Sequence, residues 1–135
     1  MIGLLMPLLC SCNKVTGDIA EQLPALWVTI QNNTGTPIDA THPVYLVFYS
    51  EKNWTNPWLQ IGSTSDTIID PAVGTTTTYL MAFLDLNNNG VVDAGEPCTG
   101  HENKDHAVPD ELTKLEFLPL EWRMLTITLE ATRVY

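Results

Sequence analysis

Residues 75–97 read TTTTYLMAFLDLNNNGVVDAGEP, a β-branched and apolar run that passes directly into a stretch rich in Asn, Asp and Gly. Residues 75–84 are the longest apolar strand candidate in the chain, because Thr, Tyr, Leu and Phe suit a pleated, packed surface. Residues 44–49 (VYLVFY) have the same character, which is typical of a strand buried on both faces. The sequence therefore predicts a β-strand in each of these two stretches.

The chain has further candidate strands. Residues 26–31 alternate apolar and polar side chains with a period of two, and NNTGTP at 32–37 is a strong turn signal. No segment keeps a helical period over ten residues. The other candidates are residues 59–61, 67–69, 115–118 and 124–129, with 131–135 extending the last. The sequence therefore predicts an all-β fold, a single antiparallel, Ig-like β-sandwich of about seven strands.

Composition limits the function classes. The chain has 135 residues, of which 44% are hydrophobic, so one domain with a real core is expected. The chain has sixteen Asp and Glu residues and six Lys and Arg residues, which gives a net charge of −10. This balance argues against nucleic-acid binding, which needs a basic face, and against electrostatic docking on anionic lipid.

The first dozen residues look as if they do not belong to the folded part of the chain. Residues 1–9 (MIGLLMPLL) are apolar but too short for a membrane-spanning helix. Residues 9–12 (LCSC) resemble the lipobox of bacterial lipoproteins, although no Lys or Arg precedes the apolar run. The resemblance implies a signal peptide over residues 1–12, acylation of Cys12, and a lipid-anchored protein of the bacterial envelope. Residues 13–25 then form a tether and residues 26–135 the β-sandwich domain. The alternatives are a buried N-terminal strand, or a cloning remnant with two chance cysteines.

Residues 85–96 (DLNNNGVVDAGE) match the pattern of a twelve-residue calcium loop. Calcium takes six to eight oxygens at ~2.3–2.6 Å, so its loop must curl tightly and aim alternate side chains at one centre. Gly90 stands at the sharp turn, and Val92 is expected to point into the core. The expected ligands are the side chains of Asp85, Asn87, Asn89, Asp93 and Glu96 and the backbone carbonyl of Val91. A plain hairpin loop would explain the Asn and Gly residues, but not the spacing of Asp93 and Glu96.

The residues around the loop indicate its class. An EF-hand needs a helix on each side, whereas strand-like residues 75–84 precede this loop and Pro97 follows it. Residues 82–97 (AFLDLNNNGVVDAGEP) resemble loops of bacterial cell-surface β-sandwich modules, of the prealbumin-like and adhesin B-repeat kind. The resemblance implies a seven-stranded prealbumin-like sandwich, a structural Ca²⁺ and an extracytoplasmic setting. It implies no catalytic activity.

The other chemistry-bearing residues give weaker signals. If Cys10 leaves with the leader and Cys12 is acylated, Cys98 stands alone, and we expect it to be buried. Residues 101–106 (HENKDH) are expected to be a solvated acidic loop, because the two histidines lack metal-ligand spacing.

The tryptophans divide into two pairs. Trp54 and Trp58 flank a turn, where two indoles can stack on sugar rings or fold over the end of the sandwich. Trp27 lies in a strand candidate and Trp122 two residues before one, and both are expected in the core. The sequence thus favours a non-enzymatic, calcium-stabilised envelope lipoprotein that acts in adhesion, scaffolding or surface assembly. The alternative is a carbohydrate-binding module that uses Trp54 and Trp58.

Overall fold

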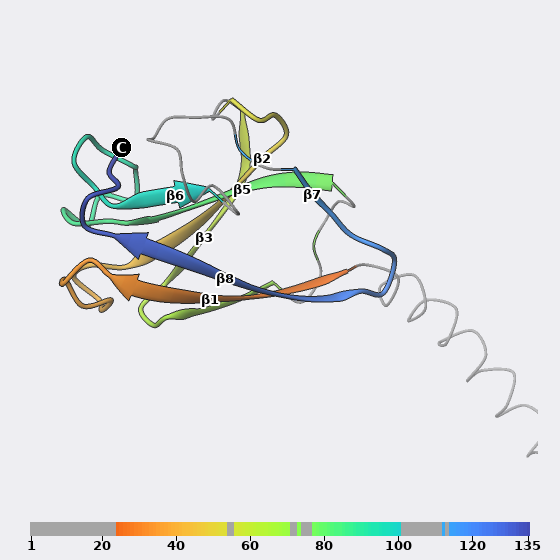
Figure 1. Cartoon of the computed structure of the whole chain (residues 1–135), viewed down its shortest axis with the longest axis horizontal. Coiled ribbons are helices and arrows are strands. Elements are labelled where there is room, and N and C mark those ends of the chain that lie inside the picture. Colours follow the sequence, from red (N-terminus) through yellow and green to blue (C-terminus); the bar gives the residue numbers. More distant parts are fainter. Residues whose placement is uncertain (1–23, 54–55, 71–72, 74–76, 101–111, 113) are drawn as a thin grey trace, which may run out of the picture.

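A computed structural model of the chain describes residues 24–53, 56–70, 73, 77–100, 112 and 114–135, which form eight β-strands and no helix (Figure 1). The strands are β1 (Ala25–Asn33), β2 (Val44–Tyr49), β3 (Pro57–Ser63), β4 (Thr67–Asp70), β5 (Thr77–Leu84), β6 (Cys98–Gly100), β7 (Lys114–Glu116) and β8 (Trp122–Glu130). The all-β, sandwich-like fold is as predicted from the sequence. The predicted strand count was one short, because the three-residue β6 is too brief to leave a periodic signal.

Several sequence predictions fall on residues that the structure does not describe. These are the signal peptide (residues 1–12) with Cys12, almost all of the tether (13–25), Trp54, and residues 101–106. No helix among the described residues is long and apolar enough to cross a membrane.

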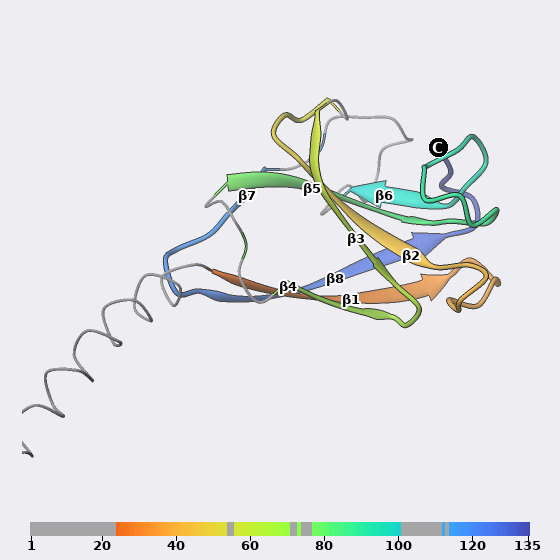
Figure 2. The ribbon, with the colours of Figure 1, turned by 180° about the vertical axis from the view of Figure 1, so that it is seen from behind.

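The strands form two sheets. One has three strands in the order β4-β1-β8, and the other has five, in the order β3-β2-β5-β6 with β7 also paired to β5. Every pairing is antiparallel except that of β1 with β8, which runs parallel along the full length of both strands. The prediction of a purely antiparallel sandwich was therefore wrong at this one pair. Figures 1 and 2 show β1 and β8 side by side in one layer, with β2, β5 and β6 in the other.

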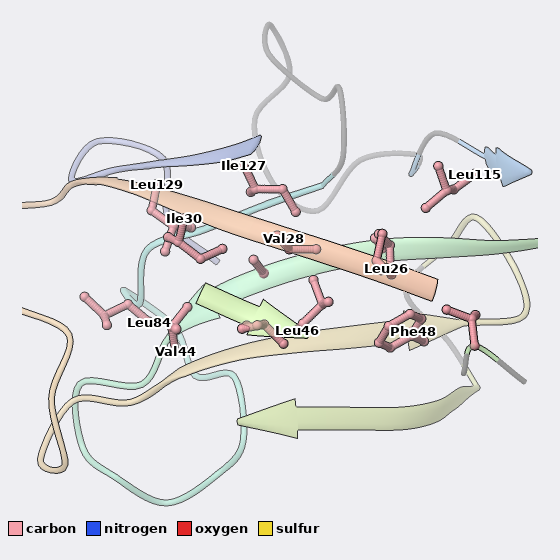
Figure 3. Close-up of a cluster of buried hydrophobic side chains, with 14 of the residues drawn as sticks. Leu26, Val28, Ile30, Val44, Leu46, Phe48, Leu84, Leu115, Ile127 and Leu129 are labelled. Carbon is pink, nitrogen blue, oxygen red and sulfur yellow. The ribbon is translucent and has the colours of Figure 1, made fainter. Parts of the chain in front are cut away.

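The main core lies between the two layers (Figure 3). The three-stranded sheet contributes Leu26, Val28 and Ile30 from alternate positions of β1, as the period of two predicted. The five-stranded sheet contributes, among others, Leu46 and Phe48. Burial of these aliphatic and aromatic side chains is the main force that holds the layers together.

The five-stranded sheet is also covered on its other face. Val47 and Tyr49 of β2 and Met81 and Phe83 of β5 form a second buried cluster with Cys98. Both β2 and β5 therefore bury side chains on both faces of the sheet, at odd-numbered and at even-numbered positions. This confirms the interpretation of VYLVFY as a strand buried on both faces.

The tryptophan expected in the core near the C-terminus lies instead on the surface. Trp122 is exposed, and Trp27 is only half-buried. On β1 the inward positions are Leu26 and Val28, so Trp27 faces outward. Exposed and less exposed residues alternate along the first half of β8, where Trp122 is exposed and Arg123 is half-buried, so Trp122 faces outward as well. The strand assignment was right, but the outer face of this sheet carries large apolar residues that an apolar-in, polar-out pattern does not anticipate.

Candidate metal centre

The candidate calcium loop joins β5 to β6, two neighbouring antiparallel strands. Its two ends are held close together, because the N–H of Leu84 donates to the carbonyl of Pro97 at 2.9 Å. Within the loop, Asn88, Gly90 and Gly95 have φ angles of 59°, 76° and 92°. Gly90 thus has the left-handed backbone that the sequence pattern requires at this position.

Asp85, the first residue of the loop, is completely buried. Its Oδ1 accepts the backbone N–H of Asn89 at 3.2 Å, and its Oδ2 accepts that of Gly90 at 2.7 Å. The loop therefore curls around this carboxylate, because the two donors lie four and five residues further along the chain.

Glu96, the last residue of the loop, is 3% exposed and has the same kind of environment. Its Oε1 accepts the N–H of Leu86 and its Oε2 accepts the N–H of Asp93, both at 2.8 Å. The backbone N–H of Glu96 in turn donates to the carbonyl of Asp93 at 3.1 Å. The side chain of Glu96 thus joins the end of the loop to its beginning.

The three remaining side chains predicted as ligands meet one another. The amide groups of Asn87 and Asn89 donate to Oδ2 of Asp93 at 2.8 and 2.6 Å. These two hydrogen bonds lower the pKa of Asp93, because they stabilise its ionised form. The Oδ1 atoms of the same two asparagines accept the N–H groups of Asn89 and Val91, at 3.2 and 2.9 Å. An oxygen that accepts one hydrogen bond keeps a second lone pair for another partner.

Val91 and Val92 lie next to each other with different exposure. The side chain of Val91 is exposed to solvent, whereas its backbone N–H donates to Oδ1 of Asn89 within the loop. Val92 packs against the second buried cluster, as predicted. This contact holds the loop against the outer face of the five-stranded sheet.

The two buried carboxylates have unusual partners. Among the described residues, Asp85 and Glu96 bond to backbone N–H groups and form no ion pair with Lys or Arg. A buried carboxylate is costly unless its charge is compensated, and backbone dipoles compensate only part of it. A bound cation would supply the missing positive charge.

The chemistry of the donor set fits a hard cation. The loop offers carboxylate, amide and carbonyl oxygens and no His or Cys side chain, which suits Ca²⁺ rather than Zn²⁺. Within the described part of the chain, no three His, Cys, Asp or Glu side chains converge closely enough to form a metal cluster by themselves. A site here therefore needs the Asn and backbone oxygens as well as the carboxylates.

The loop is fastened to its surroundings by contacts that the sequence did not reveal. The Gln60 amide on β3 donates to the carbonyl of Gly90 at 2.7 Å. At the other end, the N–H of Tyr135 donates to the carbonyl of Glu96 at 3.0 Å, and the N–H of Gly95 donates to the carbonyl of Tyr135 at 3.1 Å. Residues 131–135 thus do not extend β8 as predicted; Val134 instead forms a bridge with Pro97. These contacts join segments far apart in the sequence, so no local pattern signals them.

An open hollow of about 600 Å³ lies beside the loop, between Pro43, Tyr45 and Gly62 on one side and Asn88 on the other. The ring of Tyr45 stacks on that of Phe83, with centroids 5.2 Å apart. It also covers Gly62, where an added Cβ would come within 2.6 Å of Tyr45 Cε1. The Tyr45 ring, which lies between Phe83 and Gly62, therefore forms one wall of the hollow.

Trp58 and Cys98 are not among the predicted calcium ligands. Trp58 is partly exposed, contacts the Phe48 ring at a centroid distance of 5.3 Å, and donates from Nε1 to Thr78 Oγ1 at 3.3 Å. Its indole is thus held by the sheet but keeps an accessible part. Cys98 is a buried free thiol, as predicted, and burial, with the nearby Glu96 carboxylate, raises its pKa to about 12.

Comparison with known proteins gives no relative. No protein-family model, no curated protein and no solved structure matches this chain. The functional argument therefore rests on the residues and geometry described above.

Proposed function

We propose that this protein is a non-enzymatic, calcium-stabilised β-sandwich lipoprotein of the bacterial cell envelope. It would be anchored through lipid on Cys12 and act in adhesion, scaffolding or surface assembly. The observation that carries the calcium part is the burial of Asp85 and Glu96 in one oxygen-rich loop, with backbone N–H groups as their partners. The lipobox-like residues 9–12 are the observation that supports the lipid anchor.

Calcium would act here as a structural ion. Asp85 follows β5 directly, and Glu96 lies two residues before β6 and bonds to the C-terminal segment. An ion shared by these two carboxylates would hold the end of one strand, the start of the next and the chain terminus together. Three carboxylates are a modest count for a calcium site, which suits the millimolar calcium outside cells.

Thermal unfolding of the full chain tests the calcium site. The melting temperature is measured with millimolar Ca²⁺, with Mg²⁺ and with EDTA. Calcium at 100 times its Kd would add about 2.7 kcal/mol, a shift of several degrees for a domain of this size. Asp85→Ala removes the buried carboxylate at the start of the loop, and Asp66→Ala is the control at an exposed position. A Ca²⁺ shift that survives Asp85→Ala, or that is absent from the unchanged chain, would refute a calcium site in this loop.

Acylation of Cys12 is tested separately. The chain is expressed in bacteria that are fed a labelled fatty acid, and the label on the purified protein is measured. The label is expected in the unchanged chain and in Cys10→Ser, and is expected to disappear in Cys12→Ser. Equal labelling of the two variants would remove the anchor from the proposal.

Carbohydrate binding is the second candidate function. The accessible part of Trp58 favours it, since an indole face suits the C–H surface of a sugar ring. A glycan array compares the unchanged chain with Trp58→Ala and Trp54→Ala. No binding, or binding that neither variant weakens, would exclude this function.

A further inference from the structure

The three-stranded sheet carries a large apolar surface on its outer face and at one end, which we call the outer apolar patch. Its most exposed members are Trp122 (65%), Met124 (73%), Leu118 (72%) and Leu120 (59%). Its other two members are Ile69, which is exposed, and Trp27, which is half-buried. Exposed apolar surface of this extent on a small domain indicates a contact with another molecule or with a membrane.

The strand registers place these residues side by side. Trp27 on β1 is aligned with Ile69 on β4 and with Met124 on β8, so the three form a row across the sheet. Trp122 lies on the same face of β8, two residues before Met124. The patch is thus continuous from β4 to the start of β8.

A rigid turn extends the patch beyond the sheet. The N–H of Glu121 donates to the carbonyl of Leu118 at 3.1 Å, and Oε2 of Glu121 accepts the N–H of Leu118 at 2.7 Å. Oε1 of Glu121 also pairs with Arg123 at 3.0 Å. These bonds close the turn that carries the exposed Leu118 and Leu120, four and two residues before Trp122.

The backbone at Leu120 is strained for a leucine. Its φ is +62°, the left-handed region that Gly and Asn adopt more easily than other residues. Because the side chain is exposed, packing within this chain does not explain why leucine occupies the position. Strain of this kind points to a function for the exposed side chain.

The patch lies where the segment that would bear the anchor joins the fold. The N–H of Ala25 donates to the carbonyl of Glu121 at 2.8 Å, and Ala25 is aligned with Trp122 in the parallel pair. Residues 13–24 separate Cys12 from Ala25, and covalent geometry limits their reach to about 40 Å. A lipid on Cys12 would therefore keep the patch close to the bilayer and raise its effective concentration there.

We propose that the outer apolar patch, with Trp122, Met124, Leu118 and Leu120 at its tip, rests in the interfacial layer of the bilayer that holds the lipid on Cys12. This inference rests on the anchor in the proposed function. Trp suits the headgroup boundary because its ring is apolar and its N–H is polar, and exposed Leu and Met side chains can enter the adjoining acyl region. Because the chain has a net charge of −10, the contact is apolar and does not need anionic lipid.

The experiment uses the full chain with Cys10→Ser, coupled through Cys12 to a maleimide-bearing lipid in phosphatidylcholine vesicles. Buried Cys98 does not compete, because its thiol is inaccessible and its pKa is raised to about 12. Lipids brominated near the headgroup quench the fluorescence of tryptophans that enter the interface. We expect quenching that is largely lost in Trp122→Phe and retained in Trp58→Phe, its control on the other sheet. Met124→Lys, which keeps every tryptophan, should also weaken the quenching.

Three results would overturn the inference: no quenching, quenching unchanged by Trp122→Phe and Met124→Lys, or a stable dimer in solution that Met124→Lys dissociates. The last would assign the patch to a second copy of the chain. Chemical coupling replaces acylation by the cell, so the readout is independent of the labelling test of Cys12. Absence of label on Cys12 in bacteria would refute the anchor, whereas absence of quenching with a labelled Cys12 would refute only the bilayer contact.

Discussion

The carboxylate of Glu96 reaches back across its loop to Leu86, whose N–H it accepts at 2.8 Å although the two residues are ten positions apart. The other oxygen of the same carboxylate accepts the N–H of Asp93, and the backbone carbonyl of Glu96 accepts the N–H of Tyr135. One residue thus joins the start of the loop, its end and the C-terminus. This arrangement stabilises the fold with or without an ion in the loop.

We expect Glu96→Gln to lower the free energy of unfolding even in EDTA. One carboxylate oxygen would become an NH₂ group, which cannot accept the N–H that now donates to it, and a buried donor left unpaired costs about 1–3 kcal/mol. Urea unfolding in EDTA measures the loss. The control is Glu116→Gln, an exposed residue paired with Lys114 at 2.8 Å, where a loss of about 1 kcal/mol or less is expected. Equal losses in the two variants would show that the Glu96 hydrogen bonds add nothing specific.

The loop and the central strands could be predicted from sequence because their signals are local. The spacing of Asp85, Gly90 and Glu96 encodes a curled loop, and its hydrogen bonds run between these positions and their near neighbours. The parallel pairing of β1 with β8 and the bonds of Tyr135 could not be predicted, because they join residues about a hundred or forty positions apart.

Trp122 shows a second limit of the sequence. A tryptophan in a strand usually packs inside, yet here its position in the alternation along β8 places Trp122 on the outer face of the sheet. Hydrophobicity alone does not say which face of a strand meets the core when both faces carry large apolar residues.

Alkaline pH should destabilise the fold well before its arginines lose charge. Burial raises the pKa of Cys98 from 9.0 to about 12 and that of Tyr49 from 10.0 to about 12. Above about pH 9 the unfolded chain releases these protons while the folded chain keeps them, so the free energy of unfolding falls as pH rises towards 12.

Urea unfolding at about pH 8 and about pH 10.5 measures this fall. Cys98→Ala and Tyr49→Phe remove the titrating groups, and each variant should lose less stability between the two pH values than the unchanged chain does. If the loss is the same in all three proteins, these buried groups are not its cause.

Gly62→Ala should destabilise the wall of the hollow beside the loop. An added Cβ would lie 2.6 Å from Tyr45 Cε1, and the Tyr45 ring cannot move away freely because it stacks on Phe83. Overpacking of this kind costs about 1–3 kcal/mol, measured by thermal or urea unfolding. In a Tyr45→Ala background the obstructing ring is absent, so Gly62→Ala should cost clearly less. Equal costs in both backgrounds would mean that the ring is not the obstacle.

Replacing Leu120 with asparagine should make the fold more stable. Its φ of +62° costs most residues about 1–2 kcal/mol, whereas asparagine adopts this conformation readily. The exposed leucine side chain has little packing to lose, so we expect Leu120→Asn to raise the free energy of unfolding by about 1 kcal/mol. Leu118→Asn is the matched control, since Leu118 lies in the same turn, is at least as exposed and has no positive φ. A gain in both variants, or in neither, would show that backbone strain at residue 120 is not the cause. A gain confined to Leu120→Asn would mean that the natural residue lowers stability, which is expected if its apolar side chain serves a contact outside the domain.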